Sequence, residues 1–224
     1  MVHASMRAVG GRAADVVIAL LEALGPQGTL MAYVDFEPTE EVPGFDLVSS
    51  PASTSHGVLA EVIRSWPGAV RSANPGASMV AIGARATWLC ADHPLDYGYG
   101  PGTPLARLVE VQGHVLLLGS HLDHVTLLHH AEHLARLPDK RVVRHTITSG
   151  GEELTFEEFE TSEPIVASMP HAYFDHLMRA YLATGSCTTG VVGRASSHLV
   201  PAAELVRFAV AMMEREHGDV AARG

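Results

Sequence analysis

Residues 113–138 read GHVLLLGSHLDHVTLLHHAEHLARLP and carry the clearest structural signal in the chain. The apolar run over residues 114–119 is typical of a strand that is buried on both faces. Apolar residues then recur with a helical period and predict a helix over residues 126–137, which Pro138 ends. A buried strand followed by a helix favours an α/β fold, in which functional side chains gather where strands end.

The rest of the chain also alternates between helical and extended patterns. Helices are predicted over residues 12–24, 57–66, 104–111, 172–183 and 202–215. Strands are predicted over residues 28–34 and 79–83, a hairpin over 141–148 and 152–159, and an irregular or extended segment over 191–200. This order predicts a layered α/β/α fold with a central mixed sheet and a small β-rich and helical C-terminal extension.

Size and composition limit the possible functions. The 224 residues suit a single domain spanning 1–224, and 15 Lys+Arg against 25 Asp+Glu give a formal charge of −10. Such a charge disfavours nucleic-acid binding and attracts cations. No apolar run approaches the roughly 18 residues of a membrane span, and no signal peptide is recognisable. Cys90 and Cys187 lie far apart, which predicts buried, reduced thiols in a cytoplasmic protein.

The predicted helix over residues 126–137 places several titratable side chains on one face. His129, Glu132, His133 and Arg136 follow i, i+3, i+4 and i+7 spacing. A histidine three residues before a glutamate can give one ring nitrogen to the carboxylate and keep the other free as a base. The pattern therefore indicates a general base at His129.

Two other interpretations of this helix are open. A histidine-rich helix can simply be a solvated surface, because structural networks also place acids beside bases. The i, i+4 pair His129 and His133 could also bind zinc, although the helical H-E-x-x-H pattern is absent. A second acidic segment, from Asp35 to Asp46, is either a solvated loop or a wall that binds cations.

Six blocks of sequence carry a family resemblance. They read VHASMRAVG, LGPQGTLMAYVDFEP, WPGAVRSANP, GYGPGTPLARLVEVQGHVLLLG, TLLHHAEHLARLP and FETSEP, in this order. Together they resemble the aminoglycoside 3-N-acetyltransferase family over almost the whole chain. The resemblance implies an α/β/α fold and transfer of the acetyl group of acetyl-CoA to the 3-amino group of 2-deoxystreptamine aminoglycosides, which gives antibiotic resistance.

The resemblance also implies roles for individual residues. His129 would be the general base, Glu132 its acidic partner, and Thr126 a contact of the thioester carbonyl. The residues implied to bind the cosubstrate acetyl-CoA are Ser5, Met6, Arg7, Ser55, His56, Gly57, Arg71 and Ser72. The carboxylates implied to bind the ammonium groups of the aminoglycoside are Asp35, Glu37, Asp123, Glu158, Glu160 and Glu163.

The chain departs from the family pattern in two places. Family members usually carry a few dozen residues before the strand at Val2, so the usual N-terminal segment is expected to be lacking. Asn74 stands where the family usually has a histidine, and an asparagine cannot titrate.

The sequence is therefore compatible with three functions. The first is an acetyltransferase that uses no metal and acts on small molecules as a monomer or homodimer, with no nucleic-acid or membrane partner. The second is a metal-dependent hydrolase, whose ligands would be His121, Asp123, His129 and His133. The third is a non-catalytic protein that binds aminoglycosides.

Overall fold

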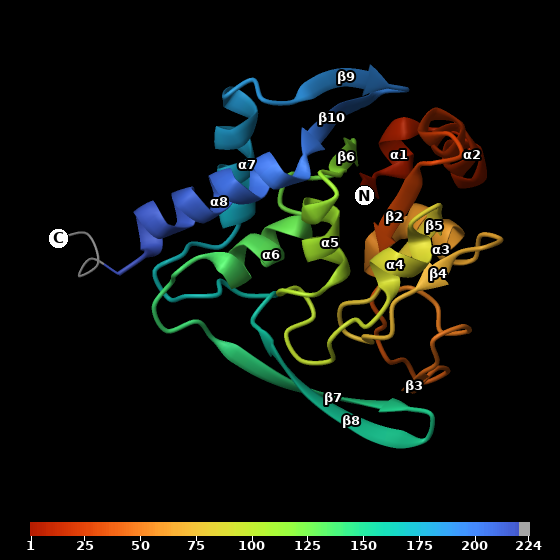
Figure 1. Ribbon diagram of the computed structural model, residues 1–224, viewed down its shortest axis with the longest axis horizontal. Helices are drawn as coiled ribbons and strands as arrows, with labels where there is room; N and C mark the ends of the chain where they lie inside the picture. The colour runs from red at the N-terminus through yellow and green to blue at the C-terminus, as the bar shows by residue number, and fades with distance from the viewer. Residues whose placement is uncertain (220–224) are drawn as a thin grey trace.

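The computed structural model describes residues 1–219 and has helices and strands alternating along the chain, as predicted (Figure 1). The strands lie in three sheets. The first sheet has the order β1 (Val2–Ala4), β6 (His114–Leu118), β10 (Ala195–Pro201) and β9 (Thr188–Val192), in which only β1 and β6 are parallel. The second is antiparallel, with the order β2 (Thr29–Tyr33), β5 (Met79–Gly83) and β4 (Val70–Arg71). The third joins β3 (Gly44–Phe45), β7 (Val142–Ser149) and β8 (Glu152–Phe159).

The first two sheets form one layer between two hydrophobic cores. Along β2, Met31 belongs to one core, while Leu30 and Ala32 belong to the other. Along β6, Leu117 and Leu118 divide in the same way. Successive side chains of a strand point to opposite faces, so each of these strands is buried on both sides. The predicted α/β/α layering is therefore confirmed.

Helices cover both faces of this layer. One core contains side chains of α2 (Ala13–Leu24) and α3 (Gly57–Arg64). The other contains side chains of α4 (Ala86–Cys90), α5 (Pro104–Glu110), α6 (Leu127–Leu134), α7 (Tyr173–Ala183) and α8 (Ala202–His217). The short helices α1 (Met6–Val9), α4 and η1 (Thr54–His56) were not predicted, because so few residues show no helical period.

The strand layer is divided between β1 and β2. These strands have Cα atoms within 8 Å of each other, yet they belong to different sheets. The predicted central mixed sheet is thus two sheets side by side.

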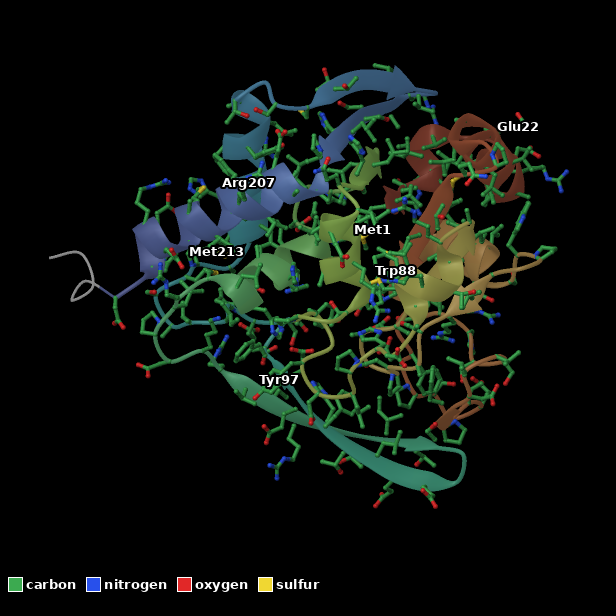
Figure 2. The ribbon with its side chains drawn as sticks, viewed as in Figure 1. Met1, Glu22, Trp88, Tyr97, Arg207 and Met213 are labelled. Carbon is green, nitrogen blue, oxygen red and sulfur yellow. The ribbon has the colours of Figure 1, made fainter. Side chains whose placement is uncertain are left out.

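The predicted hairpin is confirmed as β7 and β8, which project from the body of the molecule (Figure 1). Gly150 and Gly151 connect the strands with positive φ angles of 60° and 86°. Tyr97 joins the hairpin to the body: its backbone N–H donates to the carbonyl of Glu157, and its ring lies 5.1 Å from that of Phe159 (Figure 2).

Helix α6 is shorter than predicted. The backbone becomes extended at Ala135 (φ −66°, ψ 137°), three residues before Pro138. The Nζ of Lys140 donates to the His133 carbonyl, and the Arg136 N–H donates to the Glu214 carboxylate on α8. Arg136 therefore leaves the helix and does not share a face with the histidines, which corrects the prediction.

The two cysteines differ in burial. Cys90 is buried and Cys187 is half-buried, both as free thiols, so the prediction of buried cysteines is correct for Cys90 alone. Within residues 1–219, no helix has the length and apolar character needed to cross a membrane.

Candidate active site

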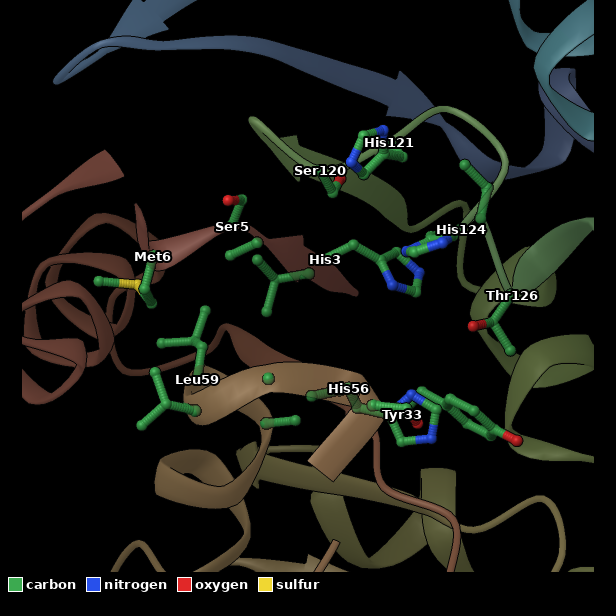
Figure 3. A pocket seen from close by; sticks show the side chains of 18 of the residues that line it. His3, Ser5, Met6, Tyr33, His56, Leu59, Ser120, His121, His124 and Thr126 are labelled. Atoms are coloured by element: carbon green, nitrogen blue, oxygen red, sulfur yellow. The ribbon is translucent and has the colours of Figure 1, made fainter. Parts of the chain in front are cut away.

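A cavity of about 640 Å³ opens where the strand layer divides, and we call it the β1–β2 cavity (Figure 3). Its walls include residues 2–7, 55–60 and 123–126, together with Tyr33, Ile63, His129 and Thr161. The cavity therefore lies between the end of β1, the start of α3 and the loop that follows β6. Ligand sites of α/β folds typically occupy such positions.

A second cavity of about 200 Å³ lies beyond His129, and we call it the acidic cavity. It is lined by residues 161–164 and 169–174, together with Asp123, His129 and Glu132. Asp123, His129 and Thr161 line both cavities. His129 is consequently accessible from two spaces of different chemical character.

The imidazole of His129 is held in one orientation. Its Nδ1 lies 2.8 Å from Oε2 of Glu132, whose side chain is only 6% exposed. The rings of Tyr99 and Phe174 flank it at 5.2 and 4.9 Å. Because a carboxylate accepts hydrogen bonds, Nδ1 carries the proton and Nε2 has the free lone pair that a base requires. The predicted His129–Glu132 pair is therefore present in the structure.

Thr126 lies one turn before His129. It is 8% exposed, lines the β1–β2 cavity, and its side chain does not cap α6. The hydroxyl group can therefore donate a hydrogen bond to a ligand in this cavity.

Six of the eight residues implied to bind acetyl-CoA line the β1–β2 cavity. They are Ser5, Met6, Arg7, Ser55, His56 and Gly57. Figure 3 shows Ser5 and Met6 at the end of the cavity next to α1, and His56 beside Tyr33 on the side of α3.

Arg71 and Ser72 have structural roles instead. The Arg71 guanidinium donates to the carbonyls of Ser50 and Val34 and lies over the ring of Phe45. Burial lowers the pKa of Arg71 to about 10. Ser72 is fully buried and bonds to His93. The prediction that these two residues contact acetyl-CoA is not supported, because their polar groups are already satisfied within the fold.

Two of the six carboxylates implied to bind the drug, Asp123 and Glu163, line the acidic cavity. Glu158 is buried instead, with its Oε1 2.8 Å from Nε2 of His133. Glu160 accepts hydrogen bonds from Ser162. Burial acts to raise the pKa of Glu160, but these hydrogen bonds outweigh burial and lower it.

The remaining two predicted carboxylates lie near the start of α3. Asp35 bonds to Nε2 of His56, and Glu37 accepts from the Ser53 hydroxyl. Of the six, Asp123 and Glu163 thus line the acidic cavity, and the other four line neither cavity.

Asn74 stabilises a loop. Its side-chain nitrogen donates to the carbonyls of Pro94 and Leu95, and its oxygen accepts from the N–H groups of Gly76 and Ala77. All of this polar capacity is used locally, so the asparagine has a structural role that needs no titration.

Sequence reasoning missed the aromatic residues of the site. Tyr99 and Phe174 flank His129, and Tyr33 lines the β1–β2 cavity beside His56. Tyr99 occurs in a glycine-rich turn over residues 98–104. Nothing in the local pattern indicated that its ring would face a distant histidine.

The ligand set of a metal-dependent hydrolase is not assembled. His133 lies outside both cavities and uses Nε2 for Glu158, while His129 uses Nδ1 for Glu132. Across the described part of the chain, no three His, Cys, Asp or Glu side chains are arranged to hold a metal ion.

Comparison with known proteins agrees with this geometry. The family model described as aminoglycoside 3-N-acetyltransferase matches residues 1–214. The curated aminoglycoside N(3)-acetyltransferase III of Pseudomonas aeruginosa is 42% identical over 247 aligned residues, which cover 100% of this chain and 90% of that protein.

Solved structures give the same result. AAC-IIIb in a binary complex with CoASH matches with a TM-score of 0.94 and 44% identity, covering 97% of this chain and 90% of that chain. AAC-VIa bound to sisomicin matches with a TM-score of 0.88 and 34% identity, covering 98% and 91%. Sequence, fold and site therefore lead to one conclusion: the chain belongs to the aminoglycoside 3-N-acetyltransferase family.

Proposed function

We propose that this acyltransferase moves the acetyl group of acetyl-CoA to the 3-amino group of a 2-deoxystreptamine aminoglycoside, with His129 as general base. The observation that carries the proposal is the place of His129, at the junction of the β1–β2 cavity and the acidic cavity. A base that bridges two cavities can act between two substrates that enter from different sides.

The β1–β2 cavity suits acetyl-CoA. Met6, Leu59 and Ile63 supply apolar wall, which fits the uncharged pantetheine arm. Arg7 is exposed beside them and can meet a phosphate group. The complex of AAC-IIIb with CoASH supports this assignment.

The acidic cavity suits an aminoglycoside. Asp123, Glu132 and Glu163 line it, and the whole chain has a net charge of −10. A polycationic drug is attracted by both features. The complex of AAC-VIa with sisomicin supports this assignment.

The proposed chemistry begins with proton removal. An ammonium group has no lone pair, so Nε2 of His129 takes a proton from the 3-amino group and the neutral amine attacks the thioester carbonyl. Glu132 stabilises the imidazolium that forms on His129. The Thr126 hydroxyl donates to the carbonyl oxygen as negative charge develops there.

The test is release of free thiol from acetyl-CoA in the presence of sisomicin, followed with a chromogenic thiol reagent. The expected result is sisomicin-dependent release by the wild type and its loss in His129→Ala. The matched control is His114→Ala, because His114 is exposed and lines neither cavity. Thiol release that is unchanged in His129→Ala would contradict the role of His129.

The same protein samples separate the other two functions. Calorimetry that shows sisomicin binding without thiol release would select the non-catalytic binder. Stoichiometric zinc in the purified protein, with hydrolysis in place of transfer, would select the hydrolase. A cytoplasmic location fits the use of acetyl-CoA and stays a prediction, as does the oligomeric state.

A further inference from the structure

The β1–β2 cavity contains a second histidine–carboxylate pair that the proposed reaction does not use. Nε2 of His56 bonds to Oδ1 of Asp35, and the two side chains are 22% and 24% exposed. Because Nε2 is occupied, Nδ1 is the ring nitrogen left for a ligand, and His56 lines the cavity. Asp35, which was expected to bind the drug, orients His56 instead.

A line of aromatic rings connects this pair with His129. The His56 ring packs edge-on against Tyr33 with centroids 4.5 Å apart, and the Tyr33 and Tyr99 hydroxyls are hydrogen bonded. Tyr99 in turn lies 5.2 Å from the His129 ring. Figure 3 shows His56 and Tyr33 on the side of α3, with Thr126 on the facing side. The two imidazoles therefore stand on different walls of one cavity.

The reaction has a second proton requirement. When the carbon–sulfur bond breaks, the electron pair moves to sulfur, and the CoA thiolate must gain a proton. His129 has at that stage just taken a proton from the amine and faces the acidic cavity. A separate acid on the other wall would meet the sulfur without displacing the amine.

We propose that His56 is this acid and gives its Nδ1 proton to the departing CoA sulfur, with Asp35 as its positioning residue. The inference rests on the function proposed above. Once His129 has passed the ammonium proton to water, the neutral amine attacks: the C–N bond forms and the C–S bond breaks, the remaining amine proton goes to His129 as the amide forms, and the His56 proton goes to sulfur to give CoASH. Afterwards His129 loses and His56 regains one proton by exchange with water, so no other reactant is needed.

Neighbouring titratable groups do not replace His56 in this role. Tyr33 and Asp35 face it from β2 and the segment after β2, His3 from β1, and His124 from the loop after β6. Burial lowers the pKa of His3 to about 3, so its ring is neutral at physiological pH and has no second proton to give. The side chain of His124 is 64% exposed and lies 3.7 Å from Asp123.

The experiment compares two acetyl donors in the wild type, His56→Gln and the control His114→Gln. One donor is acetyl-CoA, and the other is an acetyl thioester of 4-nitrothiophenol, whose thiolate leaves without protonation. With sisomicin as acceptor, His56→Gln is expected to lower kcat/KM about 100-fold for acetyl-CoA and no more than about threefold for the aryl thioester. CoA affinity measured by calorimetry is expected to stay within about threefold.

A second variant guards against a folding defect. Asp35→Asn leaves the imidazole in place and removes the negative charge beside it, so the activity with acetyl-CoA is expected to fall about tenfold, with the same donor selectivity. Equal losses with both donors, no loss, or a loss explained by weaker CoA binding would overturn the role of His56 alone. A wild type that acetylates no aminoglycoside would overturn the proposed function, and this inference with it.

Discussion

Replacement of Glu132 by glutamine tests the central pair with the least change of shape. Glu132 is buried, and its Oε2 lies 2.8 Å from Nδ1 of His129. The glutamine oxygen can still accept from Nδ1, so the ring keeps its orientation while the negative charge is lost. The charge matters most when His129 carries an extra proton, which happens only during the reaction.

The expected loss follows from the strength of this contact. A hydrogen bond to a charged group contributes about 1.5 to 3 kcal/mol, which corresponds to a roughly 10- to 150-fold lower rate at about 1.4 kcal/mol per decade. Because the interaction strengthens in the transition state, we expect the loss in kcat and little change in the KM for acetyl-CoA.

The assay is steady-state thiol release with sisomicin as acceptor. Glu110→Gln serves as control, because Glu110 is exposed at the end of α5 and lines neither cavity. A kcat within about threefold of the wild type, or a loss confined to the KM for sisomicin, would refute the reasoning. The second outcome would mean that Glu132 binds the drug from the wall of the acidic cavity.

Three further predictions concern stability. Glu158→Ala leaves His133 buried without its partner and is expected to lower the free energy of unfolding in urea by about 2 to 4 kcal/mol, whereas exposed Glu153→Ala on the same strand should change it little. Ala172, at φ 58°, precedes α7 in the left-handed region, so Ala172→Gly should raise this free energy by about 0.5 to 1 kcal/mol, and a lower Tm would contradict the strain. Burial lowers the pKa of His93 to about 4. The unfolded chain therefore binds this proton first, and the wild type should lose about 3 kcal/mol more than His93→Gln as the pH falls from about 6.5 to about 4. Parallel pH profiles of the two proteins would count against the assignment.

Local pattern was enough for most of the secondary structure. The helix predicted over residues 12–24 is Ala13–Leu24, and it ends where the Gly25 N–H donates to the Leu21 carbonyl at φ 66°. The strand predicted over residues 79–83 is Met79–Gly83. The His129–Glu132 contact was also predictable, because residues three apart on a helix are neighbours in every fold.

The sequence pattern gave wrong predictions where a residue distant in the chain determines the local structure. The end of α6 depends on Glu214 and Lys140, which approach from α8 and from beyond the helix. The positive charge of Arg71 suits a residue that binds phosphate. In the structure its guanidinium instead donates to the carbonyls of Ser50 and Val34. The type of a side chain determines which partners it can bond to, and only the packing of the folded chain determines which of them lies within reach.

The sequence by itself thus determined the α/β class, the helical face of His129 and Glu132, and a net charge that suits a cationic substrate. Only the tertiary structure decided that the strand layer divides between β1 and β2, that Asp123 and Glu163 meet in one cavity, and that Asp35 holds His56. The physical reason is the range of the forces involved. Helix and strand periods act within a few residues, whereas a cavity forms from segments more than a hundred residues apart, whose approach depends on how every layer packs.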